Sequence, residues 1–167
     1  ALEKVQQAHP RCHTIIVGGD DVSYGQKPSD APNWREKMLR EVKLDASRTH
    51  FMGKLPYDQY RKVLQVSAAH IYLTYPFVLS WSMLEAMASG CLVIGSRTGP
   101  VQEVITDGEN GLLVDFFDTG AMADRLVEAI NNQAAFKRVR EAAQQTVRER
   151  YSLADGDRAF RRLLVAA

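Results

Sequence analysis

Residues 80–105, SWSMLEAMASGCLVIGSRTGPVQEVI, constrain the fold more than any other part of the chain. Ser80 or Ser82 can cap a short helix, and Gly90 can end that helix in a left-handed turn. Residues 92–94, Leu-Val-Ile, then form a compact apolar run that is typical of a buried strand. A helix followed directly by a buried strand is typical of folds in which strands and helices alternate.

The turn that follows this strand also leads into the N-terminus of a helix. It contains Ser96, Arg97, Thr98 and Gly99, and Pro100 suits the first position of a further helix. Two helix N-termini at the ends of neighbouring parallel strands would direct backbone N–H groups and positive dipole ends into one crevice. The segment therefore predicts an anion site, most naturally for a diphosphate.

Short apolar segments alternate with helical patterns along the whole chain. They are β-branched or aromatic and lack clean polar alternation, as expected for parallel strands covered on both faces. We expect a Rossmann-like α/β fold: a doubly wound parallel sheet with helices on both faces. Strands are expected at residues 14–17, 50–52, 71–73, 92–94 and 112–114, and helices at 34–42, along Tyr57, Tyr60 and Leu64, after an N-cap at Asp118, and over a tail of about 134–167.

Composition limits the class of protein. The 167 residues fit one domain, and the net charge of +1 gives no electrostatic case for nucleic acid as a partner. No apolar run approaches the roughly 20 residues of a membrane span. Cys12 and Cys91 lie far apart and predict buried free thiols in a reducing, cytoplasmic setting. Because the chain opens within a helical pattern, we expect a piece of a longer protein, cut before the first strand of this domain.

Several nucleotide-binding and metal-binding motifs are excluded. The sequence GGDD at 18–21 does not have the spacing of a dinucleotide-binding turn, and no phosphate-binding GxxxxGK[ST] loop occurs. The acidic pair in GGDD could suit a phospho-receiver domain, but residues 71–76 supply no acceptor Asp. The DGD sequence at 155–157 resembles a metal motif, yet its helical context favours a cap or turn. We therefore expect no metal site and no cofactor.

Residues 83–114, MLEAMASGCLVIGSRTGPVQEVITDGENGLLV, carry a family resemblance. They resemble the donor-nucleotide half of retaining GT-B glycosyltransferases of the family 4, or group 1, type, and the likeness extends loosely to nearly the whole chain. It implies a C-terminal domain, one half of a GT-B fold, that binds a nucleoside-diphosphate sugar. Transfer would be metal-independent, to a saccharide or lipid-linked acceptor held by an N-terminal domain outside this chain, so the chain alone would be inactive. Cell-envelope polysaccharide synthesis and peripheral membrane association are the implied setting.

The resemblance assigns the sharpest role to Glu85, the Glu of LEAMA, which in the family holds the two ribose hydroxyls. A carboxylate can accept two hydrogen bonds from a cis-diol. From the residues alone, Ser82 and Glu85 could instead form a capping box. The family's other Glu, eight positions earlier, is replaced by Phe77. Phe77 either borders the pocket for the donor sugar or packs beneath the loop.

The other donor-binding positions follow from the same resemblance. Glu103 matches the Glu of the second motif, although a helix-start carboxylate explains it equally well. Lys54 and Arg97 are possible local cations or ordinary surface charges. The four histidines form no spaced pair, so no catalytic residue is assigned. The diphosphate loop matches Ser80, Trp81, Ser82 and Met83, the second glycine-rich turn matches Thr98 and Gly99, and the loop against the nucleotide base matches Gly53, Lys54 and Leu55.

Two other functions remain open. A sugar-nucleotide epimerase on a GT-B fold would share the crevice but should place carboxylates and a His around the sugar. A non-catalytic nucleotide-sugar-binding domain would keep the fold with an altered site, and Phe77 favours it. A transfer assay with several donors would separate these functions.

Overall fold

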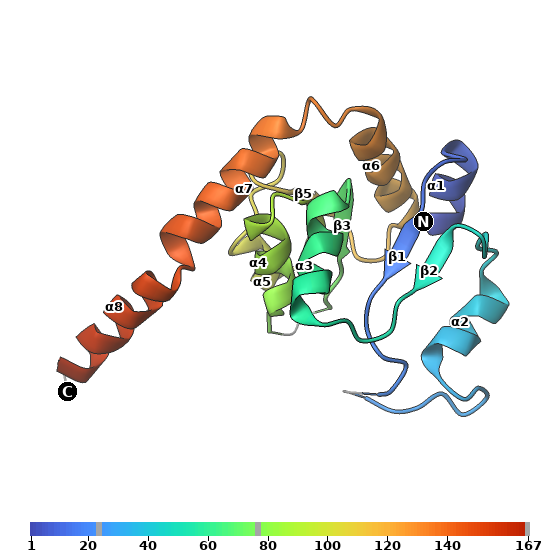
Figure 1. The fold of residues 1–167 in the computed structure, drawn as a ribbon, viewed down its shortest axis with the longest axis horizontal. Helices are drawn as coiled ribbons and strands as arrows, with labels where there is room; N and C mark the ends of the chain where they lie inside the picture. The colour runs from blue at the N-terminus through green and yellow to red at the C-terminus, as the bar shows by residue number, and fades with distance from the viewer. Residues whose placement is uncertain (23–24, 76–77, 166–167) are drawn as a thin grey trace. The chain divides into compact units, whose positions relative to one another are not determined.

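A computed structural model of the chain describes residues 1–22, 25–75 and 78–165. The chain divides into two compact units, Ala1–Val63 and Leu64–Ala167, here called the first and second units (Figure 1). Helix α3 (Tyr57–Val66) crosses the boundary between them. Helices and parallel strands alternate from α1 to α6 within the described residues, and two further helices follow, so the predicted α/β class is confirmed.

The first unit contains a two-stranded parallel sheet. Strand β1 (Thr14–Ile16) pairs with β2 (Thr49–Phe51), and Thr14 lies opposite Thr49. Helices α1 (Leu2–Ala8) and α2 (Trp34–Glu41) and the first part of α3 also belong to this unit. The buried Gln6 side chain of α1 donates to Thr49 Oγ1 at 2.9 Å, and this hydrogen bond fixes α1 to the start of β2.

The second unit contains a three-stranded parallel sheet. Its strands are β3 (Ala69–Tyr72), β4 (Leu92–Ser96) and β5 (Leu112–Val114), in the order β3-β4-β5. All five residues of β4 are buried, as expected for a central strand whose faces are both covered. The helices are α4 (Trp81–Ala88), α5 (Gly99–Gln102), α6 (Thr119–Asn131), α7 (Lys137–Arg150) and α8 (Leu153–Val165).

The core of the second unit surrounds β4. Helices α4, α6 and α7 each contact this strand, and α4 also packs against α7. Met83 and Met87 of α4 are fully buried, as are Ile94 of β4 and Leu112 of β5. Burial of several such side chains, at about 1.5–3 kcal/mol each, holds the helices on the sheet.

Capping and turn residues in the sequence predicted the ends of several helices. Gly90 has φ +77 and follows α4, and the Asp118 side chain caps α6 by accepting from the Ala121 N–H at 2.8 Å. Pro100 lies in the first turn of α5, one position later than expected. Both cysteines are free, but only Cys91 is buried, because Cys12 lies in the half-exposed segment before β1.

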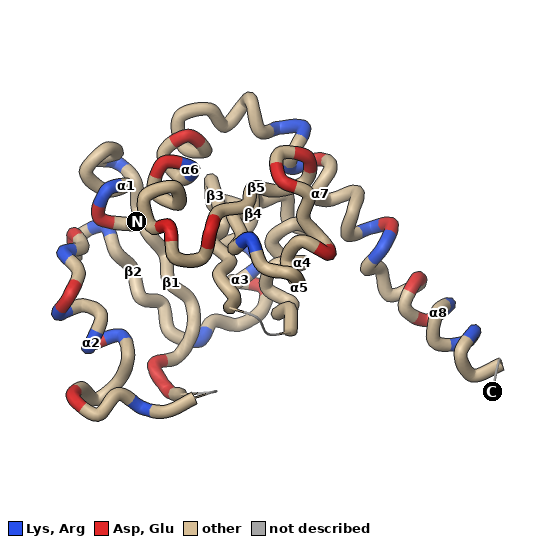
Figure 2. Tube along the Cα trace, turned by 180° about the vertical axis from the view of Figure 1, so that it is seen from behind, with Lys and Arg blue, Asp and Glu red and all other residues tan. Residues whose placement is uncertain are grey.

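Helices α7 and α8 lie where the sequence predicts a helical tail. The DGD sequence lies at the start of α8, where Asp155 hydrogen-bonds Ser152 and pairs with Arg158, so the cap interpretation is confirmed. Acidic and basic residues are interspersed along α7 and α8 (Figure 2). Among the described residues, no helix combines the length and the apolar character needed to cross a membrane.

Candidate functional site

The start of α4 is fixed by the strand before it. The hydroxyl of Tyr72, a buried residue at the end of β3, accepts a hydrogen bond from the Ser80 N–H at 2.8 Å. Ser80 is the N-cap, and its Oγ accepts from the Ser82 N–H at 3.3 Å. Ser82 is therefore the second helical residue, and the alternative in which Ser82 and Glu85 form a capping box is wrong. Ser80 takes the cap because the chain is still extended at this residue.

Glu85 lies one turn inside α4 and is half-buried. Within the described residues, its carboxylate accepts no hydrogen bond and forms no ion pair. A carboxylate without a protein partner is left to water or to a ligand, so its oxygens are available to accept hydrogen bonds. Trp81, on the same helix, is 76% exposed, whereas Met83 is fully buried and contributes to the core. Of the matched α4 positions, Glu85 thus offers a carboxylate that is available to accept hydrogen bonds from a ligand.

Ser96 organises the carboxyl end of β4. Its Oγ is fully buried, donates to the Thr74 carbonyl at 2.8 Å and accepts from the Thr74 N–H at 3.0 Å. The same oxygen lies 3.4 Å from Thr98 Oγ1. One hydroxyl therefore extends the pairing of β3 and β4 and holds the next turn. Sequence reasoning treated Ser96 only as part of a turn; a hydroxyl closing an apolar strand was the available signal.

The second glycine-rich turn, at Thr98 and Gly99, leaves open space beside its glycine. Thr98 is the N-cap of α5, with extended backbone, and Gly99 is the first helical residue. A Cβ built on Gly99 would meet nothing within 4 Å, and its φ is not positive. Neither packing nor backbone conformation within the described chain therefore requires glycine here. A ligand that approaches the backbone would supply the reason.

Glu103 does not lie at a helix start. Helix α5 makes a single turn, and Glu103 is its C-cap, with its carbonyl accepting from Arg150 Nη2 at 3.4 Å. The helix-start interpretation is wrong, because the pattern suggested a longer helix than the chain forms. The side chain is exposed, and its predicted donor contact stays a prediction.

Arg97 is engaged in a structural ion pair. Its Nη2 lies 2.8 Å from Asp107 Oδ2, and Asp107 Oδ1 accepts from the Leu113 N–H at 2.9 Å. Burial acts to raise the pKa of Asp107. The hydrogen bonds from Arg97 and Leu113, together with the charges of Arg97 and Arg125, outweigh burial and lower that pKa. The Arg97 guanidinium is thus already paired with Asp107 beside β5, and Arg97 is a poor candidate for the cation that binds phosphate.

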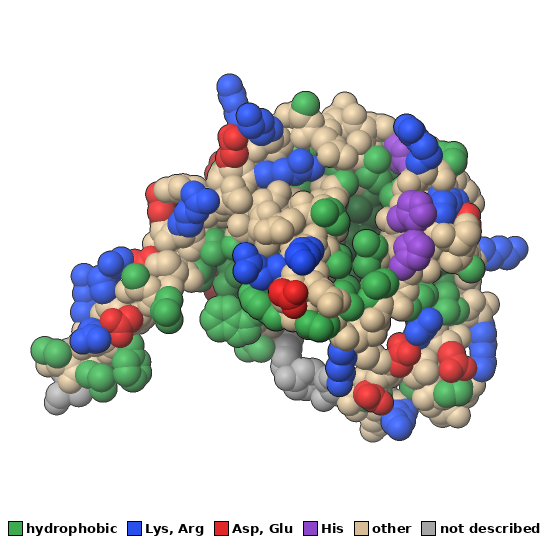
Figure 3. All heavy atoms as spheres, in the orientation of Figure 1, with side chains coloured by type: hydrophobic (Ala, Val, Ile, Leu, Met, Phe, Trp, Pro, Cys, Tyr) green, Lys and Arg blue, Asp and Glu red, His purple; other side chains and the backbone are tan. Residues whose placement is uncertain are grey.

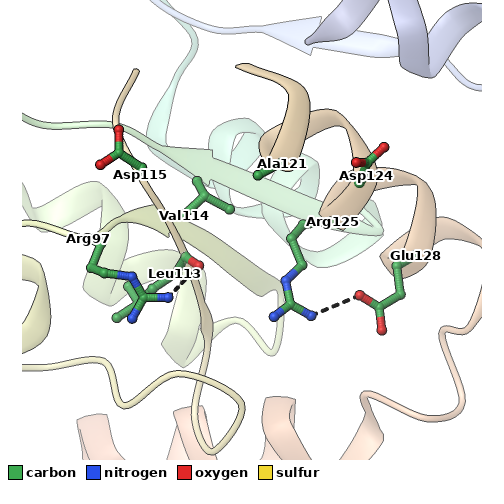
Figure 4. A pocket seen from close by; sticks show the side chains of 8 residues that line it. All are labelled: Arg97, Leu113, Val114, Asp115, Ala121, Asp124, Arg125 and Glu128. Carbon is green, nitrogen blue, oxygen red and sulfur yellow. Dashed lines mark hydrogen bonds and ion pairs between the residues drawn. The ribbon is translucent and has the colours of Figure 1, made fainter. Parts of the chain in front are cut away.

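The same region contains a shallow hollow of about 400 Å³ beside β5 and α6 (Figure 4). Both charge signs line it, and Arg125 pairs with Glu128 at 2.9 Å across one turn of α6. Arg97 lies on its other side, committed to Asp107. Because these guanidinium groups are already neutralised, the hollow does not form an obvious anion site. It is lined by Arg97, Leu113, Val114, Asp115, Ala121, Asp124, Arg125 and Glu128.

The DGENG motif is structural. The buried Asn110 side chain accepts from the Thr106 N–H at 2.8 Å and donates to the Val104 carbonyl and to Thr146 Oγ1, both at 3.0 Å. This amide ties the turn before β5 to helix α7. A Cβ at Gly111 would lie 2.8 Å from Ile105 Cγ2, so close packing requires glycine there. The contacts of this part of the family motif are therefore explained by the stability of the fold.

The loop matched to the nucleotide base belongs to the first unit. Gly53 has φ +63, and its carbonyl accepts from the Gly18 N–H at 2.9 Å, which joins the ends of β1 and β2. The exposed Lys54 lays its methylene groups against Gly19, and Leu55 is half-buried. The structure brings Ser80, Glu85 and their neighbours together within the second unit. Phe77 lies outside the described residues, and its role stays a prediction.

Comparison with known proteins places the chain in context. A family model described as glycosyl transferases group 1 matches residues 1–146. The chain is 31% identical over 104 residues to the N-acetyl-alpha-D-glucosaminyl L-malate synthase of Bacillus anthracis, covering 62% of this chain and 27% of that protein. It is 30% identical over 136 residues to the D-inositol 3-phosphate glycosyltransferase of Corynebacterium glutamicum, covering 80% and 31%. The chain thus spans less than a third of these two relatives.

Solved structures confirm the fold. Anabaena HepE, crystallised in complex with UDP-glucose, superposes with a TM-score of 0.83 at 18% identity, over 99% of this chain and 44% of that one. The sucrose-phosphate synthase of Thermosynechococcus elongatus gives 0.71 at 24% identity, over 99% and 43%. At these identities the likeness concerns the fold. The expected Rossmann-like half of a GT-B fold is confirmed.

Proposed function

This chain belongs to the glycosyl transferases group 1 family, and from that premise we propose that it binds a nucleoside-diphosphate sugar. We propose retaining, metal-independent transfer of the sugar to an acceptor held by an N-terminal domain outside the chain. The observation that carries the proposal concerns the half-buried residue Glu85, which lies one turn after the Ser80 cap of α4 and whose carboxylate has no partner among the described residues. Its position suits a ribose whose diphosphate lies at the helix start.

The start of α4 supplies the electrostatic part of this function. A helix N-terminus carries roughly half a positive charge and favours phosphate. The hydrogen bond from Ser80 to Tyr72 holds this end rigidly against β3. A fixed dipole stabilises the diphosphate as negative charge develops on it during sugar transfer, without reorganisation. Glu85 would accept hydrogen bonds from the two ribose hydroxyls and fix the position of the nucleoside.

The donor is proposed in two steps. HepE, which shares the fold, has been crystallised with UDP-glucose and with UDP, so UDP is the first base to test. The donor sugar is held by groups other than a Glu at position 77, since Phe77 cannot accept a hydrogen bond.

The acceptor is proposed to be a saccharide or a lipid-linked saccharide, used in cell-envelope polysaccharide synthesis in the cytoplasm. Helix α8 supports peripheral membrane association of the full-length enzyme. It exposes Leu153, Phe160 and Leu163 and carries arginines on its polar side. Apolar and basic side chains on one helix are typical of helices that lie in a membrane surface.

The test uses the full-length protein with UDP-, GDP- and ADP-sugars, a panel of saccharide acceptors, and a chelator in every reaction. We expect transfer from one nucleotide class with retained anomeric configuration, read by NMR of the product. Conversion of the donor sugar without acceptor would indicate the epimerase instead. Donor binding without turnover in every combination would indicate the non-catalytic domain. An inverted product, or activity that the chelator abolishes, would contradict the proposed mechanism.

A further inference from the structure

Two histidines meet on the sheet of the first unit. His13 Nδ1 and His50 Nε2 share a hydrogen bond of 2.9 Å, in which one ring nitrogen donates and the other accepts, and the ring centroids are 5.2 Å apart with 10° between the ring planes. Since each nitrogen lies little more than one ångström from its own centroid, both nitrogens lie near the line that joins the centroids. The rings therefore face each other edge to edge in nearly one plane. Histidine side chains gather on the face of the molecule shown in Figure 3.

The strand register explains why residues 37 positions apart meet. Ile15 of β1 lies opposite His50 of β2, and His13 precedes Ile15 by two positions, so both histidines share one face. Sequence spacing alone gave no sign of this pair. The register, once known, predicts it.

The backbone beneath the pair is held firmly. The Arg48 guanidinium donates to the carbonyls of Gln6 and His9 at 3.1 and 3.0 Å, and the Arg48 carbonyl accepts from the Thr14 N–H at 2.8 Å. Asp45 pairs with Arg48 at 2.8 Å and offsets its charge. Hydrogen bonds from Ser47 and then Arg48 lower the pKa of Asp45 to about 2, so this carboxylate stays ionised at neutral pH.

We propose that His13 and His50 form a two-histidine chelating site for a divalent transition-metal ion, with Ni²⁺ and Cu²⁺ preferred. Imidazole is a ligand of choice for these ions. Both rings must turn to bind one ion; with the two nitrogens kept at their present separation of 2.9 Å and each about 2.0–2.1 Å from the ion, they subtend an angle of roughly 90°. That angle belongs to square-planar and octahedral coordination, whereas tetrahedral Zn²⁺ needs a wider separation.

Chelation replaces the hydrogen bond between the rings: the nitrogen that carries the proton becomes an acceptor by a change of tautomer, and both rings turn so that their lone pairs point at the ion. His13 is exposed, which leaves its ring free space to turn. Within the described residues, no group of three or more metal-ligating side chains occurs. Water would therefore complete the coordination shell, and the ion would exchange readily. Because it joins β1 to β2, a bound ion would stabilise the folded state through mass action.

The test is a calorimetric titration of the tag-free protein with Ni²⁺ at neutral pH, using His13→Gln, His50→Gln and the control His70→Gln. We expect one Ni²⁺ per chain for the wild type and for His70→Gln, whose residue lies on β3. Each variant of the pair should lose at least about tenfold in affinity, since even residues that only orient a ligand contribute about 10–100-fold. Ni²⁺ should raise the Tm of the wild type and leave that of the pair variants unchanged.

Two comparisons keep the proposal falsifiable if a variant fails to fold by circular dichroism. The electron paramagnetic resonance spectrum of wild-type protein with one Cu²⁺ should show two nitrogen ligands; one or none would overturn the site. Ni²⁺ should bind more tightly than Zn²⁺, and the reverse order would contradict the 90° geometry. Equal Ni²⁺ affinity of wild type and a folded His13→Gln variant would overturn the site directly.

Discussion

Arg97 and Asp107 together bind both polar groups of one peptide position on the outer strand of the second sheet. Their side chains lie 2.8 Å apart; Asp107 accepts from the Leu113 N–H, and Arg97 donates to the Leu113 carbonyl at 3.1 Å. Among the described residues, β5 pairs only with β4. The two side chains therefore occupy hydrogen-bonding positions that a further strand would otherwise use, which protects the edge.

This arrangement predicts a measurable stability effect for Asp107→Asn. The variant removes the ion pair and the charge on the Leu113 hydrogen bond, and we expect a loss of about 1–2 kcal/mol at pH 7. Asp124→Asn is the matched control, because Asp124 is exposed and has no partner among the described residues. Urea unfolding of the three proteins gives the free energies.

The pH dependence has a definite sign. The folded-state pKa of Asp107 is lowered, so its contribution to stability is complete above the unfolded pKa of about 3.9 and is lost as pH falls through the folded pKa. The difference between wild type and Asp107→Asn should therefore shrink as pH falls below about 4. A difference that is constant between pH 7 and pH 3 would show that the charge of Asp107 contributes nothing.

Two glycines of the family motif should respond differently to alanine. Gly111→Ala places a methyl group 2.8 Å from Ile105 Cγ2 in the core, and overpacking of this kind costs about 1–3 kcal/mol. Gly99→Ala meets no protein atom within 4 Å and should leave stability within about 0.5 kcal/mol. If a diphosphate approaches the Gly99 backbone, that variant should instead lose nucleotide affinity. Melting temperature and nucleotide titration of both variants separate the two roles, and an unchanged affinity of Gly99→Ala would remove Gly99 from the site.

Sequence reasoning found the five strands because short apolar runs bounded by turns are local signals. The ends of β1, β2, β3 and β4 differ from the expected ones by one or two residues, since they depend on pairing partners distant in sequence. Ser80 rather than Ser82 is the cap, and its extended backbone is held by a hydrogen bond to Tyr72, eight residues earlier and on another element. Propensity alone gives these two serines the same rank.

The remaining differences have the same physical origin. Asn110 and Asp107 belong to a recognisable motif, yet their partners Thr146 and Arg97 lie 36 and 10 residues away. Nothing in the motif's spacing distinguishes a residue that contacts a ligand from one whose hydrogen bonds stabilise the fold. The His13–His50 pair likewise depends on a strand register that composition and periodicity do not encode.

Phe77 carries a prediction about sugar selectivity. If its ring borders the pocket of the donor sugar, Phe77→Ala in the full-length enzyme should change discrimination among sugars on one nucleotide by tens-fold. That scale corresponds to about 1–3 kcal/mol for a methylene-sized change in an apolar wall. Affinity for the bare nucleoside diphosphate should change less. A lowered Tm with sugar preference intact would identify Phe77 as a packing residue.

The nucleotide affinity of Glu85→Gln tests the proposed function most directly. Because Ser80 caps α4 and Glu85 has no partner among the described residues, the substitution should leave Tm nearly unchanged. If Glu85 holds the ribose hydroxyls, the full-length variant should bind its nucleoside diphosphate about 1.5–3 kcal/mol more weakly. Glu109→Gln, at an exposed position of the turn before β5, is the control for loss of a carboxylate. Wild-type affinity in a folded Glu85→Gln protein would contradict the assignment of this helix to the donor nucleotide.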